Sequence, residues 1–268
     1  MKIGNREFEI KDHTYIMGIL NITPDSFSDG GKFIAFDDAL FRVEEMISQG
    51  MDILDIGGES TRPGYQMLSE EEEITRIMPV IEGVKSRFNV PVSLDTYKGK
   101  VAKAGIEAGV DFINDIWGLK YDASMAEVIA KAGIPCCLMH NRQAADYQNF
   151  MEEVAADLAE TIQIATKAGI AEDKIILDPG VGFGKTYENN LEVINRLDAL
   201  KGVGYPILLG ASRKSVIGLT LDLPVSERLT GTLVTTVIAV LRGCMFVRVH
   251  DVKENVQAIK MAEAILGR

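Results

Sequence analysis

Polar residues with side chains suited to chemistry follow each of the short apolar runs in this sequence. They are Asn21, Asp55, Glu59, Asp95, Asn114, Asp115, His140, Asp178, Lys214, Arg248 and His250. One polar residue after a strand is usually a turn former or a helix cap. However, Lys214, Arg248 and His250 are poor caps, and polar residues end all eight runs. We therefore interpret the series as a binding site assembled from many segments of the chain.

This series divides into two chemical halves. One half offers hydrogen-bond acceptors and an amide, from Asp95, Asn114 and Asp178. The other half suits an anion, from Lys214, Arg248 and His250. Such a site predicts a ligand with a donor-rich planar head and a negatively charged tail, because charge-assisted hydrogen bonds recognise both groups well. A pterin-like or guanidine-like ring that carries a phosphate ester has this chemistry.

Alternating strands and helices must bring these residues together. The predicted strands are residues 15–20, 52–56, 92–94, 112–113, 135–139, 175–177, 207–209 and 245–249. The predicted helices are residues 37–49, 70–87, 99–108, 124–132, 150–168, 189–200, 227–241 and 253–266. Ser69 with Glu72 predicts a capping box for the second helix, and Ser226 is a plausible cap for the seventh.

Strict alternation implies a parallel sheet in an α/β fold. We predict a (β/α)8 TIM barrel with a short N-terminal β-hairpin at residues 2–10, in a single domain over residues 1–268. An open doubly wound sheet is the alternative. The barrel is favoured because polar residues end nearly every strand, whereas an open sheet concentrates them at one switch point.

Composition excludes several classes of partner. The chain has 28 Lys and Arg against 39 Asp and Glu, a net charge of −11, whereas nucleic-acid binding usually needs a basic face. The longest apolar stretch, residues 233–241, is far shorter than the roughly 20 residues that span a bilayer. Residues 1–12 lack the apolar core of a signal peptide. With three cysteines read as buried thiols, we expect a soluble protein of the reducing cytoplasm.

Three glycine-rich segments have open interpretations. Residues 178–186 (DPGVGFGKT) nearly match a P-loop, but Pro179 stands in place of the first glycine, so a tight strand-to-helix connection is the better interpretation. Residues 23–31 and 57–64 are long for minimal connections. They are either binding loops or ordered surface connections, and composition does not decide between the two.

These residues also carry a family resemblance. Residues 17–31 (MGILNITPDSFSDGG) and 55–64 (DIGGESTRPG) resemble the two opening signatures of the dihydropteroate synthases. Shorter motifs follow in the order of that family: LDT at 94–96, IND at 113–115, LMH at 138–140, LDPGVGFGK at 177–185, SRKS at 212–215 and RVHD at 248–251. Asn141-Arg142 departs from the usual pattern of the fifth loop.

The resemblance implies an activity and its cofactor. Members of the family join 6-hydroxymethyl-7,8-dihydropterin pyrophosphate to p-aminobenzoate with Mg²⁺, which gives 7,8-dihydropteroate and pyrophosphate in folate biosynthesis. No nucleophilic side chain is needed for this reaction. The family commonly forms dimers through late helices, so the apolar circumference of residues 233–241 indicates a homodimer.

It also implies roles for individual residues. The pterin edge would be held by Asp95, Asn114 and Asp178, with Lys214 at the ring carbonyl and Met139 packed on the ring. Pyrophosphate would be bound by Asn21, Arg248 and His250. Asn21 would also reach Mg²⁺, and Asp25 would help to hold the metal or the second substrate. The p-aminobenzoate pocket would be formed by Phe27, Thr61, Arg62, Pro63 and Ser215.

Three other functions are possible on the same residues. A pterin-barrel methyltransferase would use a similar set of Asp and Asn side chains, but it has no need of the anion half. A non-catalytic pterin-binding protein would bind the pterin pyrophosphate without releasing pyrophosphate. A P-loop NTPase is the least favoured function, because Pro179 stands in place of the first glycine of that motif.

Overall fold

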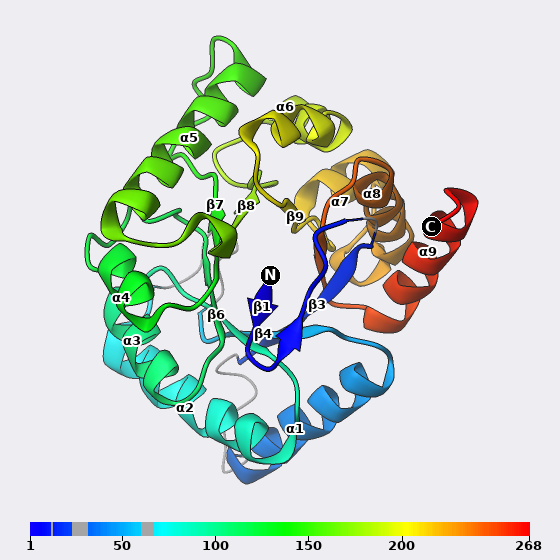
Figure 1. Ribbon diagram of the computed structural model, residues 1–268. Coiled ribbons are helices and arrows are strands. Elements are labelled where there is room, and N and C mark those ends of the chain that lie inside the picture. Colours follow the sequence, from blue (N-terminus) through cyan, green and yellow to red (C-terminus); the bar gives the residue numbers. More distant parts are fainter. Residues whose placement is uncertain (12, 23–31, 60–66) are drawn as a thin grey trace.

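The computed structural model describes residues 1–11, 13–22, 32–59 and 67–268. Its main feature is an eight-stranded parallel sheet in the order β8-β7-β6-β5-β4-β3-β10-β9. A parallel bridge between Leu177, on β8, and Ile207, beside β9, brings the two edges of the sheet together. Helices surround the closed sheet (Figure 1). The predicted (β/α)8 barrel is therefore confirmed.

The strands of the barrel are β3 (Tyr15–Asn21), β4 (Ile53–Gly57), β5 (Val92–Asp95), β6 (Phe112–Asp115), β7 (Cys136–Met139), β8 (Ile175–Asp178), β9 (Leu208–Leu209) and β10 (Phe246–Val249). The described helices are α1 (Lys32–Ser48), α2 (Glu70–Arg87), α3 (Gly99–Glu107), α4 (Met125–Ala132), α5 (Phe150–Ala168), α6 (Tyr187–Asn195), α7 (Ser215–Leu221), α8 (Leu229–Leu241) and α9 (Val252–Ile265).

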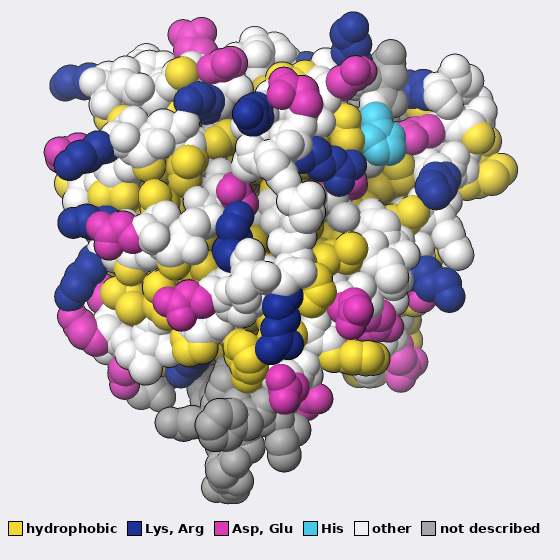
Figure 2. Space-filling view, turned by 60° about the horizontal axis from the view of Figure 1, so that its bottom comes forward, with side chains coloured by type: hydrophobic (Ala, Val, Ile, Leu, Met, Phe, Trp, Pro, Cys, Tyr) yellow, Lys and Arg dark blue, Asp and Glu magenta, His cyan; other side chains and the backbone are white. Residues whose placement is uncertain are grey.

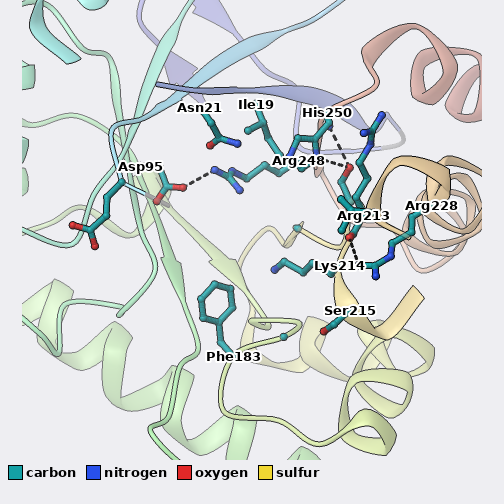
Figure 3. Close-up of a pocket in the computed structure, with 15 residues that line it drawn as sticks. Ile19, Asn21, Asp95, Phe183, Arg213, Lys214, Ser215, Arg228, Arg248 and His250 are labelled. Carbon is teal, nitrogen blue, oxygen red and sulfur yellow. Dashed lines mark hydrogen bonds and ion pairs between the residues drawn. The ribbon is translucent and has the colours of Figure 1, made fainter. Parts of the chain in front are cut away.

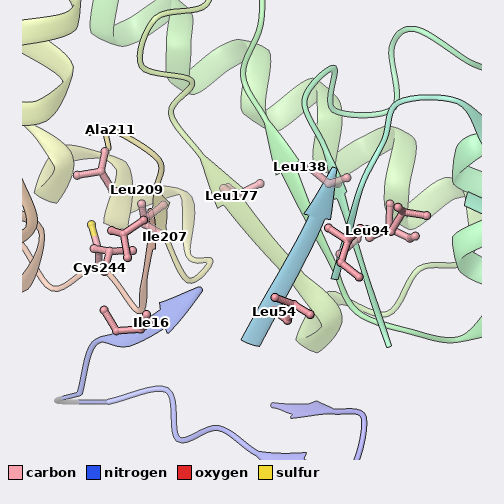
Figure 4. Close-up of a cluster of buried hydrophobic side chains, with 14 of the residues drawn as sticks. Ile16, Leu54, Leu94, Leu138, Leu177, Ile207, Leu209, Ala211 and Cys244 are labelled. Atoms are coloured by element: carbon pink, nitrogen blue, oxygen red, sulfur yellow. The ribbon is translucent and has the colours of Figure 1, made fainter. Parts of the chain in front are cut away.

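Two apolar layers hold the barrel together. Side chains that face the helices form the larger layer, and Figure 4 shows part of it, including Ile16, Leu54, Leu94, Leu138, Leu177 and Leu209. Side chains that face the barrel axis form the smaller one, which includes Met17, Ile53, Phe112, Cys137, Ile176, Leu208 and Phe246. Every strand except β5 contributes to both layers because its side chains alternate between its two faces, and the inward-facing residues of β5 are the polar Ser93 and Asp95.

The N-terminal hairpin packs against the inner layer. Its strands are β1 (Lys2–Ile3) and β2 (Arg6–Glu7), and the turn between them includes Gly4 at φ +57°, where a side chain would also meet Asp111. Phe8 is fully buried, with its ring centroid 4.9 Å from that of Tyr15. Figure 1 shows the hairpin lying across the middle of the ring of strands. The predicted hairpin is confirmed, and it covers the amino end of the barrel.

Several helix boundaries differ from the predictions. The capping box of Ser69 and Glu72 is present at the start of α2, as predicted. In contrast, α8 begins only at Leu229, and Ser226 lies in a separate 3-10 turn, so the predicted cap is wrong. The sixth helix ends at Asn195 and is followed by a 3-10 segment. Helix α7 was not predicted, because seven residues that include a glycine give little periodicity.

The cysteines agree with the prediction of buried thiols. All three cysteines are buried and free. On the face drawn in Figure 2, basic and acidic side chains are interspersed. None of the helices in the described ranges has the length and apolarity needed to cross a membrane.

Candidate active site

A ring of polar side chains lies inside the barrel, where the inward-facing residues of the strands change from apolar to polar. On β4, Ile53 belongs to the inner apolar layer, and Asp55, two positions later, faces the same way. On β10, Phe246 is followed in the same way by Arg248. The same alternation along the other strands turns five more polar side chains inward: Asn21, Ser93, Asp95, Asn114 and Asp178. The barrel is thus apolar inside at the end that the hairpin covers and polar at the carboxyl end.

Arg248, on β10, contacts carboxylates on two other strands of the ring, β4 and β5. Its Nε donates to Asp55 Oδ2 and its Nη2 donates to Asp95 Oδ2, each at 2.5 Å (Figure 3 shows the contact with Asp95). Asp55 is fully buried and also accepts hydrogen bonds from Ser93 Oγ at 2.5 Å and from Asn114 Nδ2 at 3.3 Å. Burial raises the pKa of Asp95, while the charge of Arg248 opposes that shift.

Lys214 and Asp178 lie near each other, since both side chains approach Gly210. Asp178 is buried and accepts a hydrogen bond from the Gly180 amide at 2.7 Å. Lys214 Nζ donates to the Val181 carbonyl at 2.5 Å and lies 4.8 Å from the centre of the Phe183 ring. Burial lowers the pKa of Lys214 to about 8, and the carboxylate of Asp178 opposes the shift. The titration midpoint of this lysine is therefore brought closer to neutral pH than that of an exposed lysine.

A cavity of about 230 Å³ opens beside the ring. Residues that line it include Asn21, Glu59, Asp95, Phe183, Ser212, Arg213, Lys214, Ser215, Arg228, Arg248 and His250. Figure 3 shows Lys214, Arg248 and His250 around this space, with Asp95 at its edge. His250 Nδ1 lies 2.9 Å from Ser212 Oγ. Acceptors of the pterin-like half and cations of the anion half thus border one cavity.

The residues predicted for the site fall into three groups. Those that line the cavity are Asn21, Asp95, Lys214, Ser215, Arg248 and His250. Those buried beside it are Asn114, Met139 and Asp178, with Met139 packed in a cluster with Tyr97, Ile116 and Phe183. Those outside the described residues are Asp25, Phe27, Thr61, Arg62 and Pro63. The two predicted halves also overlap, because Arg248, assigned to the anion, contacts the carboxylate assigned to the planar head.

Asp115 and His140 were included in the predicted series, and the structure directs both away from the cavity. They follow inward residues, Asn114 and Met139, so they have the opposite parity. Asp115 accepts the amides of Trp117 and Leu119 and closes a turn. His140 Nε2 lies 3.0 Å from Asp157 of α5, and its Nδ1 lies 2.7 Å from Lys185 Nζ.

Several residues of the cavity were missed from the sequence, among them Phe183, Arg213 and Arg228. Phe183 lies in the glycine-rich run, where only Asp178 was taken as functional. Arg213 has φ +56° and pairs with Asp251 through two hydrogen bonds. Arg228 precedes α8, and its Nη1 donates to the Arg213 carbonyl at 3.1 Å. The SRKS motif could have indicated Arg213, whereas no sequence signal marks Arg228.

An α/β barrel with a polar cavity at the carboxyl ends of its strands has the architecture of an enzyme for a small molecule. A family model described as pterin binding enzyme matches residues 17–250. The dihydropteroate synthase of Clostridium beijerinckii is 61% identical over 269 residues, which cover 100% of both chains. The chain therefore belongs to the pterin binding enzyme family. Within that family it groups with the dihydropteroate synthases, which are transferases.

Solved structures agree in fold. The dihydropteroate synthase of Clostridium difficile in the presence of pteroic acid has a TM-score of 0.95 at 48% identity and covers 98% of this chain and 100% of its own. That of Yersinia pestis with a sulfonamide drug has a TM-score of 0.92 at 39% identity, with coverage of 100% and 98%. That of Xanthomonas albilineans with 4-aminobenzoic acid has a TM-score of 0.90 at 38% identity, with coverage of 96% and 94%.

The buried imidazole of His140 predicts a specific dependence of stability on pH. Burial and the nearby Lys185 lower its pKa to about 3, from 6.5. Below pH 6.5 the unfolded chain therefore takes up a proton that the folded chain does not, and stability falls as the pH decreases. When the pH is lowered from 7.5 to 5, the free energy of unfolding should decrease in both proteins. The decrease should be about 1–2 kcal/mol smaller in the variant His140→Asn than in the wild type. Urea unfolding at both pH values measures this, and parallel losses in the two proteins would contradict it.

Proposed function

We propose that this enzyme condenses 6-hydroxymethyl-7,8-dihydropterin pyrophosphate with p-aminobenzoate, giving 7,8-dihydropteroate and pyrophosphate in folate biosynthesis. The observation that carries the proposal is the cavity that Asp95, Lys214 and His250 border together, with Asp178 buried beside it. Acceptors suit the N–H groups of a pterin, and cations suit a pyrophosphate tail. The relatives crystallised with pteroic acid and with 4-aminobenzoic acid support the same pair of substrates.

The pterin would bind against the buried acceptors. Asp178 and Asp95 would accept hydrogen bonds from the amine and amide of the ring, and Asn114 would add its amide. Lys214 would donate to the ring carbonyl, for which its position near Asp178 is suitable. These side chains are already hydrogen-bonded to the protein, so they need little reorganisation when the ligand binds.

Pyrophosphate would leave from the cationic side of the cavity. His250, held by Ser212, and the guanidinium of Arg248 would stabilise the negative charge that develops on the leaving group. The dihydropterin can delocalise the methylene cation that remains, so the reaction needs no covalent catalyst. The cysteines do not contradict this, because burial raises the pKa of Cys136 and Cys137 and keeps both as thiols.

The proposed cofactor is Mg²⁺. Within the described residues no group of three or more His, Cys, Asp or Glu side chains could hold a metal ion. Asn21 offers one oxygen ligand at the cavity, and Mg²⁺ commonly takes one or two protein ligands and completes its shell with phosphate oxygens and water. The donor set therefore fits an ion that arrives with the pyrophosphate. When bound, it would neutralise charge on the leaving group.

The second substrate, p-aminobenzoate, would bind on the outer side of the pterin. Ser215 is exposed at the cavity, and the ring of Phe183 lies near Lys214. The amine would then attack the methylene carbon, and positioning would supply most of the rate enhancement for such a weakly basic nucleophile. Phe27, Thr61, Arg62 and Pro63 stay predictions for this pocket.

Turnover with substrates omitted one at a time tests the function. Pyrophosphate release at full rate should require pterin pyrophosphate, p-aminobenzoate and Mg²⁺ together, and removal of the ion with a chelator should abolish it reversibly. Asp178→Asn presents a donor where an acceptor is required, and kcat/KM should fall at least about 100-fold. Binding of pterin pyrophosphate without any turnover would instead support a non-catalytic binding protein.

We propose further that the enzyme is a homodimer. Large apolar side chains are exposed on the last helices: Leu219 on α7, Val234 and Leu241 on α8, and Met261 and Ile265 on α9. Helices α8 and α9 pack against each other, so these side chains belong to neighbouring elements. A second copy of the chain, related by a two-fold axis, would cover them.

Replacing Val234, which is 56% exposed, with Glu tests the dimer. A charge at this site should dissociate the dimer and leave the barrel folded, because the side chain contributes little to the core of its own subunit. Sedimentation equilibrium should then give the mass of a monomer. The matched control is Phe41→Glu on α1, which is 70% exposed and should leave the dimer intact. A monomeric wild type, or a dimer in both variants, would exclude this interface.

A further inference from the structure

His140 and Lys185 form a buried contact that the proposed mechanism does not use. Lys185 Nζ donates to His140 Nδ1 at 2.7 Å and to the Phe183 carbonyl at 3.0 Å. Because Nδ1 is the acceptor, Nε2 carries the proton of the neutral imidazole and donates to Asp157 at 3.0 Å. Arg142 Nε also donates to Asp157, at 2.6 Å. We name the pair of His140 and Lys185 the clamp.

The clamp joins the connection after β7 to the connection after β8. Two glycines of the second connection, Gly180 and Gly184, have positive φ angles, and a Cβ on them would clash with the carbonyls of His140 and Arg142. Tyr147 Oη donates to the Gly184 carbonyl at 2.8 Å. The backbones of the two connections are therefore in direct contact on both sides of residues 181–183.

Residues 181–183 carry two groups of the cavity. The carbonyl of Val181 accepts the hydrogen bond of Lys214, and the ring of Phe183 lies 4.8 Å from the same ammonium. Gly182 and Phe183 both line the cavity, whereas the clamp residues do not. Any movement of this segment therefore displaces the surroundings of Lys214.

We propose that His140 and Lys185 are positioning residues of the transfer reaction. Their hydrogen bond holds residues 181–183 in place, and through Phe183 and the Val181 carbonyl it sets the position of Lys214. This inference rests on the proposed function. Arg142, one of the two residues that depart from the family pattern, belongs to the same arrangement, because it orients the carboxylate of Asp157 that orients His140.

A double-mutant cycle between Lys185 and Phe183 tests the clamp. Lys185→Met keeps the length of the side chain and removes its donors. In the wild-type background it should lower kcat/KM about tenfold or more, since small displacements of catalytic groups are costly. In the Phe183→Leu background the same change should cost at most about threefold, because coupled residues are not additive. Equal losses in both backgrounds would overturn the proposal, since a purely structural residue gives additive effects.

Matched variants complete the test. Lys85 donates to Asp111 at 2.8 Å, and Asp111 holds the amide of Val92 at the start of β5, far from the cavity. Lys85→Met should therefore leave the kinetics unchanged. His140→Asn keeps an acceptor for Lys185 and should retain more activity than His140→Leu, which has none. If Lys185→Met does not fold, His140→Leu replaces it in the cycle. An inactive wild type would refute the proposed function itself, whereas an active wild type with additive losses would refute only the clamp.

Discussion

The contact of Arg248 with Asp55 and Asp95 is the interaction on which the site depends. Two carboxylates with exposed side-chain fractions of 0% and 7% lie inside the barrel, and removing them from water is unfavourable. A single guanidinium offsets this cost by donating to both at once. Because the charges compensate each other, the carboxyl end of the barrel can stay polar on the inside without unfolding. The remaining acceptor capacity of Asp95 is then available to a ligand.

Alternation of side chains along the strands explains which polar residues take part. Neighbouring residues of a strand point to opposite faces, so Asn114 faces inward whereas Asp115 does not. In the same way Met139 faces inward, whereas His140 does not. The sequence predicted the strands correctly, but assigning every polar residue after a strand to the carboxyl end of the barrel interior included two that face the helices, Asp115 and His140. The residue two positions after an inner apolar residue also faces inward, as Asn114 does after Phe112. Applying this rule would have excluded the two residues that face the helices.

Pairings between distant segments could not be predicted. Arg248 and Asp55 are 193 positions apart, and nothing in the sequence indicates that the arginine assigned to an anion would contact this carboxylate. Arg228 lies at the cavity between the 3-10 turn of Val225–Glu227 and the start of α8, an arrangement that no sequence pattern indicated. Short elements such as α7 lack the periodicity on which helix prediction rests. In contrast, the long helices α2 and α5 were predicted with their observed ends.

The free energy of unfolding of Arg248→Met tests the central role of this arginine most directly. If Arg248 compensates two buried carboxylates, its loss should destabilise the protein by about 3 kcal/mol at pH 8, because both carboxylates lose their partner. The loss should become smaller as the pH falls, since Asp95, whose pKa is already raised, can then take up a proton. Arg196→Met, which removes an exposed ion pair with Glu192, is the control and should cost less than about 0.5 kcal/mol. Equal and pH-independent losses in the two variants would contradict the account.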